Sequence, residues 1–187
     1  MTRPAFVQAS YFTAVPTTHP RNPNLVVIHA TDGSELAGTA MAIAEWFAGS
    51  FVFQGAQQPA PAKSAHWVVD ALESIQCVFE ADVAWAAPGA NRRGVHVELC
   101  GRADQTSDQW HDTESSKILR RGAATVAGVC ERIKAPLILR NADEVRDGAD
   151  GICGHDTVSL AFPKPDAHTD PGPNFPWGEF MEMVRAA

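Results

Sequence analysis

The sequence has little of what would place it in a membrane, on a secretory route or on nucleic acid. No apolar run approaches the roughly 18–20 residues that a bilayer-spanning helix needs. The N-terminal stretch MTRPAFVQASYF has no basic region followed by an apolar one, so we expect no signal peptide and synthesis in a cytoplasm. With 15 lysines and arginines against 22 acidic residues, the formal charge is −7. A generic nucleic-acid binder needs a basic face, so this charge disfavours one.

Closely spaced cysteine pairs are also missing. The four cysteines are scattered, with no C-x-x-C motif, at Cys77, Cys100, Cys130 and Cys153. In a chain that folds in a cytoplasm, the expected state is four buried, reduced thiols. Cys153 is the exception to consider, because it lies two residues before His155 and is placed to compete for a metal.

The chain contains no internal repeat, low-complexity tract or linker. Its 187 residues, with 45% apolar and 20% charged content, are ordinary for one globular domain with a sizeable core. We therefore expect a single domain over residues 1–187, in which the turn-rich residues 1–24 form an N-terminal lead-in.

Two kinds of apolar pattern alternate along the chain. Short β-branched or alternating runs predict strands at 25–31, 94–100 and 136–140 and a hairpin over 64–70 and 75–79. Helical spacing of apolar residues predicts helices at 34–49, 112–133 and 175–187, and residues 54–63 are expected to form a loop. The alternation predicts an α/β domain with a central mixed β-sheet flanked by helices.

The segment GHDTVSLAFPKPDAHTDPGPNFPW, residues 154–177, combines rigid turns with metal-binding side chains. Zinc hydrolases use three protein ligands of the His, Asp, Glu or Cys type and leave one position open. His155 and Asp170 of this segment, together with His29 at the end of a predicted buried strand, are candidates for such a set. Gly154 and the DPGP turn would fix their backbone positions. The alternative for His29 is a hydrogen-bonded structural role, which is commoner for a lone histidine at a strand end.

Glu98 is a candidate general base. In the alternating run GVHVELC it falls on the polar face together with His96, opposite Val95, Val97 and Leu99. A carboxylate at such a position can take a proton from a water activated by a metal. The alternative is a solvated residue at the edge of the sheet.

These residues carry a resemblance to a known family. The pieces VVIHAT, SAHWVVD, IQCV, AW, GVHVELCG, GICGHDTVS and HTDPGPNFPW follow one another in the order of the type-2 zinc N-acetylmuramoyl-L-alanine amidases. That group includes phage endolysins, the bacterial enzyme that recycles anhydromuropeptides, and peptidoglycan recognition proteins. The resemblance extends from about Leu25 to about Trp177 and is greatest to actinobacterial phage lysins.

The resemblance implies a Zn²⁺ ion held by His29, His155 and Asp170, with Glu98 as general base and proton carrier. His168 falls where many members have a catalytic lysine, so it is expected to donate a hydrogen bond to the oxyanion. Lys164 lies nearby, although its spacing differs from that of the family's lysine.

Further positions depart from the family or lack an assigned role. Ala86 stands where members often have histidine, and His66 matches a family histidine that is not a ligand. We expect His66 to have a structural or cleft-wall role, His96 to support the site, and His19 and His111 to have no functional role. Trp85 and Trp177 are expected either in the wall of the cleft or in the core.

The implied reaction is hydrolysis of the amide between N-acetylmuramic acid and L-alanine in peptidoglycan, as in endolysin-type lysis of the cell wall. The alternatives are a cytosolic amidase that recycles soluble muropeptides and a non-catalytic peptidoglycan-binding protein. Non-catalytic members lack a metal ligand, whereas this chain retains all three, which favours an enzyme. We expect a monomer that binds peptidoglycan or muropeptides, does not bind nucleic acid or insert into a membrane, and acts on the wall after release if it is an endolysin.

Overall fold

A six-stranded mixed sheet forms the centre of the protein, whose computed structural model describes residues 5–187. The strand order is β1-β7-β6-β9-β3-β10. All neighbouring strands run parallel except the antiparallel hairpin of β6 and β7. The strands are β1 (Ala5–Phe6), β3 (Leu25–Ala30), β6 (Trp67–Val69), β7 (Ser74–Gln76), β9 (Gly94–Leu99) and β10 (Gly151–Gly154). The predicted central mixed sheet is confirmed.

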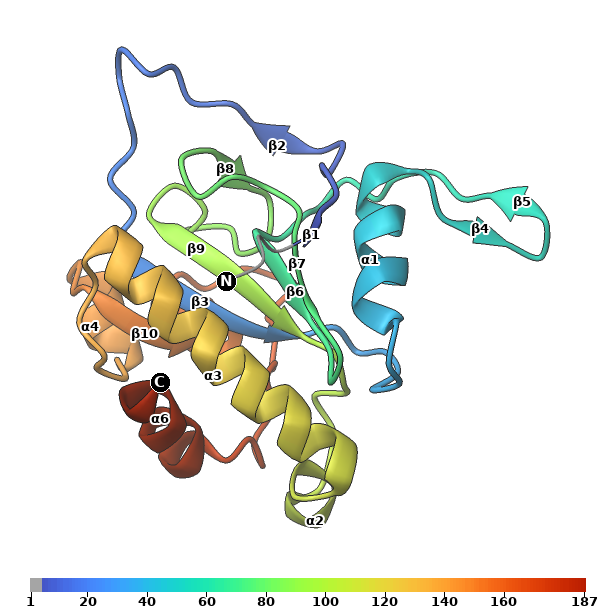
Figure 1. Ribbon diagram of the computed structural model, residues 1–187. Coiled ribbons are helices and arrows are strands. Elements are labelled where there is room, and N and C mark those ends of the chain that lie inside the picture. The colour runs from blue at the N-terminus through green and yellow to red at the C-terminus, as the bar shows by residue number, and fades with distance from the viewer. Residues whose placement is uncertain (1–4) are drawn as a thin grey trace.

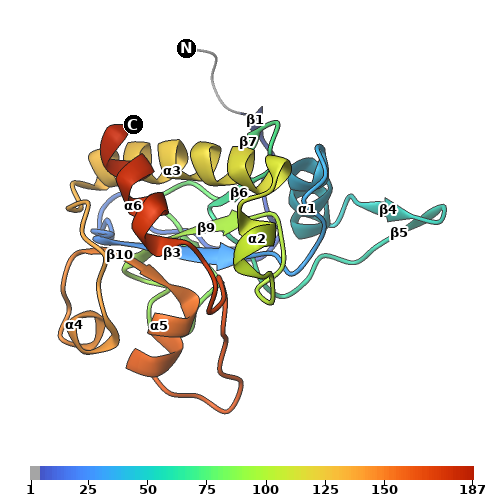
Figure 2. The same cartoon turned by 90° about the horizontal axis from the view of Figure 1, so that it is seen from below.

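Helices cover both faces of this sheet. Figure 2 shows α3 and α6 on one side and α4 and α5 on the other, whereas α1 packs against β6 and β7. The helices are α1 (Thr39–Ala48), α2 (Ser107–Trp110), α3 (Thr113–Ile133), α4 (Ala142–Arg146), α5 (His155–Ala161) and α6 (Trp177–Ala186). Among the residues that the structure describes, no helix combines the length and apolar character required to cross a membrane.

Two small strand pairs lie outside the main sheet. Strand β2 (Phe12–Thr13) pairs with β8 (Val83–Ala84), and β4 (Val52–Phe53) pairs with β5 (Ala56–Gln57). The second pair is a hairpin that projects beyond α1 in Figure 1. It includes part of the segment 54–63, for which the sequence predicted only a loop.

The two faces of β3 and β9 have different chemistry because side chains alternate along a strand. Val26, Ile28 and Val97 belong to the main apolar core that includes the buried side of α3. On the opposite face lie His29 and Glu98, which are direct partners in the parallel register of the two strands. The sheet therefore has one apolar face and one face that carries the polar candidates of the sequence analysis.

The helix predicted over 34–49 begins later than expected. Gly38 has a left-handed conformation, with φ 88°, and the helix starts at Thr39. The buried Asp70 carboxylate accepts hydrogen bonds from the backbone N–H groups of Gly38 (2.8 Å) and Ala40 (3.0 Å). A carboxylate from the end of β6 thus satisfies the first donors of the helix, and periodicity alone cannot indicate such a distant cap.

The prediction of a strand over 136–140 is wrong. Only a single bridge joins Leu139 to Ile152 there, and the side chains of Ile138 and Leu139 are 46% and 38% exposed. The apolar run lies beside the edge strand β10, where one bridge replaces a continuous ladder. Strand β10 and helix α5 have no clear signal in the sequence, because both are short and contain glycine or polar residues.

The prediction for the cysteines is confirmed. All four are buried, and no disulfide forms among the described residues. Burial raises the pKa of the Cys77 thiol to about 12, which keeps it protonated at neutral pH. The predicted N-terminal segment 1–24 contributes β1 and β2, and its first four residues lie outside the described part of the chain.

Candidate active site

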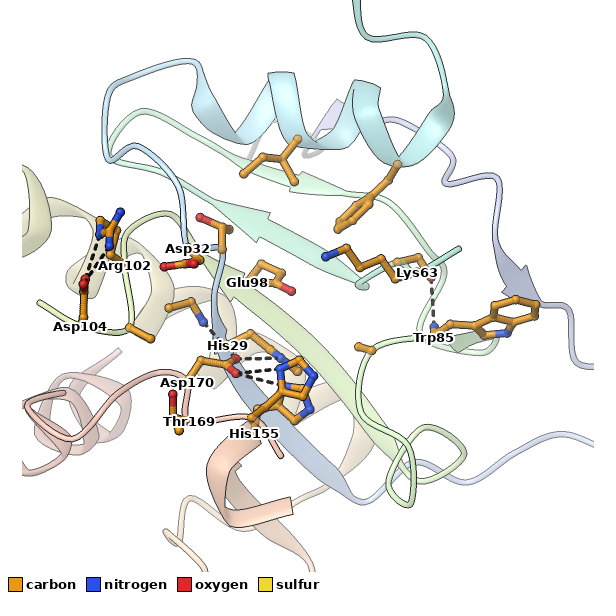
Figure 3. Close-up of a pocket in the computed structure, with 18 of the residues that line it drawn as sticks. His29, Asp32, Lys63, Trp85, Glu98, Arg102, Asp104, His155, Thr169 and Asp170 are labelled. Carbon is orange, nitrogen blue, oxygen red and sulfur yellow. Dashed lines mark hydrogen bonds and ion pairs between the residues drawn. The ribbon is translucent and has the colours of Figure 1, made fainter. Parts of the chain in front are cut away.

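Three side chains that are distant in the sequence converge at one end of the sheet. His29 comes from the end of β3, His155 is the first residue of α5, and Asp170 belongs to the loop before α6. His29 Nδ1 lies 3.2 Å from Asp170 Oδ2, and His155 Nδ1 lies 3.2 Å from Asp170 Oδ1. One nitrogen or oxygen from each residue fits within 4.8 Å of the others. Figure 3 shows the three side chains facing one another.

Two glycines allow the loop that carries Asp170 to pack closely against β10 and against the segment at Ala103. A Cβ atom on Gly154 would lie 2.9 Å from Pro171 Cδ and 3.1 Å from the Trp177 ring, so any larger residue would push this loop away. Gly172 has φ 110°, and a Cβ there would overlap the carbonyl oxygen of Ala103. The DPGP turn is therefore packed against its neighbours, which fixes the backbone at Asp170.

Hydrogen bonds and charges set the protonation of this cluster. Burial by itself would raise the pKa of Asp170, but its hydrogen bonds from His155 and His29 outweigh burial and hold the pKa well below its usual range. Burial tends to lower the pKa of His29, whereas Asp170 and Glu98 raise it more. Burial lowers the pKa of His155. At neutral pH, Asp170 therefore presents a negatively charged carboxylate beside two imidazole nitrogens.

The donor set fits a zinc ion. Two imidazoles and one carboxylate that converge on an open cleft provide the three ligands and the free position of a catalytic zinc site. Cys153 is not part of this arrangement, because its side chain packs with Val27 and Val158 in a separate apolar cluster. The competition for metal considered from the sequence therefore has no structural basis.

The three residues line a cleft of about 860 Å³, a volume typical of small-molecule and substrate sites. Its walls come from several segments and combine aromatic with charged groups. Among the lining residues are Asp32, Ile43, Trp46, Lys63, Trp85, Ala86, Glu98, Arg102, His168 and Thr169.

Glu98 lies in the cleft, next to the cluster. Its Oε2 atom is buried and has no hydrogen-bond partner among the described residues. Burial raises the pKa of Glu98, although the charges of His29 and Lys63 oppose the increase. Lys63 extends toward Glu98 in Figure 3. Because this oxygen is buried, Glu98 is not the solvated edge residue considered as the alternative. A buried carboxylate oxygen without a partner is available to a bound ligand.

His168 lies at the mouth of the cleft. Its ring stacks on His155, with centroids 3.9 Å apart and an interplanar angle of 20°. His168 Nδ1 is 3.4 Å from Asp170 Oδ1, and half of the side chain (54%) is exposed. Lys164 is exposed and is not among the residues that line the cleft. Of the two groups considered for the oxyanion, only His168 therefore reaches the site.

The other sequence candidates take distinct places. Trp85 lines the cleft and is 40% exposed, whereas Trp177 is partly buried against the core, in edge contact with Phe175. His66 is fully buried beside Arg21, and burial lowers its pKa to about 3. His111 is on the surface, within 3.2 Å of the Glu179 carboxylate.

Sequence reasoning missed four charged residues of the cleft. They lie in loops, where no periodicity marks them, and are Asp32, Lys63, Arg102 and Asp104. The available signals were positional. Lys63 directly precedes the SAHWVVD motif, and Asp32 directly follows the predicted strand 25–31. Arg102 and Asp104 lie two and four residues after the predicted strand 94–100. Residues that follow the carboxyl ends of parallel strands commonly line ligand sites.

An α/β domain with a His–His–Asp cluster and a buried carboxylate in one cleft has the arrangement of metal-assisted hydrolases. Residues 19–173 match the family model of N-acetylmuramoyl-L-alanine amidases, and the chain belongs to this family. It is an enzyme domain of the amidase type. A search of curated proteins found no match.

Solved structures of low sequence identity share the fold. A selenomethionine derivative of AmpD matches with TM-score 0.66 and 20% identity, over 98% of this chain and 96% of that one. A mutant endolysin from Bacillus subtilis matches with TM-score 0.64 and 16% identity, over 98% and 99% of the two chains. The Staphylococcus aureus hydrolase AmiA in complex with its ligand gives TM-score 0.69 and 16% identity, over 98% and 82%.

Proposed function

We propose that this amidase is zinc-dependent and cleaves the bond between N-acetylmuramic acid and L-alanine in peptidoglycan. The observation that supports zinc is the convergence of His29, His155 and Asp170 in a cleft that also contains the unpaired carboxylate of Glu98. A zinc ion in this place supplies Lewis acidity, which polarises an amide carbonyl and makes water easier to deprotonate.

In this proposal the protein groups move and stabilise protons and charge. Glu98 takes the proton from the attacking water, because its buried Oε2 has no competing partner and burial, which raises its pKa, makes the carboxylate a stronger base. It then gives the proton to the leaving amine of L-alanine. His168, stacked on His155, donates a hydrogen bond to the oxygen that becomes negative. Lys63 adds a positive charge on the facing wall of the cleft.

We further propose that residues 1–187 act as one catalytic domain and that its role is endolysin-type lysis of the wall. The similarity in fold to a Bacillus subtilis endolysin along nearly the full length of both chains supports this role. AmpD is similar over a comparable length, so the recycling alternative is addressed by experiment.

Digestion of purified peptidoglycan, followed by mass spectrometry of the products, tests the reaction. The proposal predicts stem peptides with a free L-alanine amino terminus and glycan chains that keep the lactyl group. Products cut within the glycan or between peptide stems would contradict it. Removal of metal with a chelator should abolish cleavage, and addition of Zn²⁺ should restore it.

The rate on two substrates separates the two roles. A lysin should cleave intact sacculi at least as well as soluble muropeptides. If only soluble muropeptides are cleaved, the endolysin role is wrong while the amidase reaction stands.

A further inference from the structure

His96 is buried directly behind the cleft and does not line it. Its Nδ1 atom lies 3.1 Å from Nε2 of His29, and the two ring centroids are 5.3 Å apart. The strand register explains the contact: His29 is opposite Glu98 and Val27 is opposite His96, so the two histidines are diagonal neighbours on the same face of the sheet.

The direction of this hydrogen bond follows from the other nitrogen of His29. Without a metal, Nδ1 of His29 donates a hydrogen bond to Asp170 at 3.2 Å. A nitrogen that binds a metal must present its lone pair, so with zinc bound the proton of a neutral His29 would be on Nε2, which donates to Nδ1 of His96. His96 in turn carries its proton on Nε2, for which no described residue provides an acceptor.

Contacts that do not involve the metal site hold His96 in place. Its backbone N–H donates to His66 Nδ1 (3.0 Å), and its backbone carbonyl accepts from the N–H of His66 (3.0 Å). The rings of His66 and His96 stack with centroids 5.6 Å apart. A Cβ on Gly94 would come within 3.0 Å of His96 Nε2, so the ring occupies space that a larger residue would take.

We propose that His96 is a positioning residue for the metal site, which accepts the hydrogen bond from His29 Nε2 and thereby holds His29 Nδ1 toward His155 and Asp170. This inference rests on the proposed zinc site. His96 acts through His29 and touches neither substrate nor metal. Because the acceptor is an uncharged imidazole, Asp170 remains the single anion of the ligand set. Partners of this kind fix the orientation of a ligand, and their loss typically weakens metal binding about 10–100-fold.

Zinc affinity, measured by competition with a chelator, tests the inference. His96→Leu keeps similar volume without an acceptor, and we expect zinc to bind it about 10–100-fold more weakly than the wild type. His96→Asn places an amide oxygen near the position of Nδ1 and should bind zinc within about threefold of the wild type, since it restores the acceptor. Val95→Ala removes packing from the opposite face of the same strand, so its melting temperature should fall while its zinc affinity stays unchanged.

A second measurement does not require a folded His96→Leu protein. In zinc-loaded wild-type protein, nitrogen-15 NMR of the histidine rings should place the His29 proton on Nε2, hydrogen-bonded to an unprotonated His96 Nδ1. A proton on His29 Nδ1 would overturn the inference, as would unchanged affinity in His96→Leu or equal losses in the Leu and Asn variants. If the wild type itself takes up no zinc, the proposed metal site is wrong and the positioning role is wrong with it.

Discussion

Replacement of Glu98 by glutamine separates chemistry from structure in this site. Glutamine keeps the size and shape of the side chain but cannot accept the proton of the attacking water. A well-placed acid–base group contributes about 10²–10⁴-fold, so kcat should fall by that factor. This corresponds to about 3–5 kcal/mol of transition-state stabilisation. Zinc content should stay at the wild-type level, because Glu98 is not one of the three proposed ligands.

The structure also predicts the effect of Glu98→Gln on stability. Burial raises the pKa of Glu98 and leaves Oε2 without a partner, so the ionised form of this carboxyl opposes folding. The favourable contribution of a group with a raised pKa exists below its unfolded pKa and is lost as the pH rises through the folded value. Removal of the charge should therefore leave the melting temperature unchanged or raise it by about 2–4 °C per kcal/mol gained.

Cleavage of peptidoglycan and thermal unfolding of the metal-free protein are the assays for this variant. Wild-type kcat in Glu98→Gln would refute the assignment of the base. A lower melting temperature would refute the reasoning that the carboxylate is unpaired and destabilising, and would point to a structural role.

Three further variants test other parts of the account. Gly172→Ala should lose about 1–3 kcal/mol of stability in urea unfolding and bind zinc more weakly, because the φ of 110° at Gly172 and the Ala103 carbonyl exclude a Cβ. Gly178→Ala is the control: a Cβ there meets nothing within 4 Å, so this variant should not lose stability. Trp85→Ala should raise KM about fivefold through the loss of about 1 kcal/mol of contact, at unchanged zinc content, and an unchanged KM would remove Trp85 from the substrate site. The pKa of His66 is lowered to about 3, so neutral His66 contributes fully to the free energy of unfolding above pH 6.5, and this contribution falls with acidification toward pH 3 by up to about 1.4 kcal/mol per pH unit. Urea unfolding between pH 4.5 and 7 should show this pH dependence in the wild type and a weaker one in His66→Gln. Equal pH dependence in the two proteins would contradict the prediction.

Long, regular patterns made most of the fold predictable from the sequence. The apolar spacing of 112–133 and the alternation of 94–100 correspond closely to α3 and β9. The period of the apolar residues determines whether a helix or a strand can bury them on one face. The run 136–140 was misread as a strand since apolar content alone does not determine whether a segment gains a ladder of partners. The late start of α1 depends on Asp70, which lies 31 residues beyond Thr39 and gives no local signal.

Only part of the candidate site could be predicted from the sequence. Side chains with specific metal chemistry, such as His29 and Asp170, stand out by residue type and by their place in motifs. Lys63 and the contact between His96 and His29 depend on how loops and strand register bring segments together. Those relations arise from tertiary structure, so the sequence could place His96 on the correct face of its strand but could not identify its partner.

The zinc content of purified protein, compared between the wild type and Asp170→Ala, is the most direct test of the proposed zinc site. Asp170 is the anionic member of the cluster and contacts both histidines, so its loss removes one proposed ligand and the group that contacts the other two. Elemental analysis after dialysis against limiting zinc should find one zinc ion per wild-type chain and almost none per variant chain, with the variant still folded by circular dichroism. Full zinc occupancy in folded Asp170→Ala protein, or a wild type that cleaves peptidoglycan without any metal, would contradict the account.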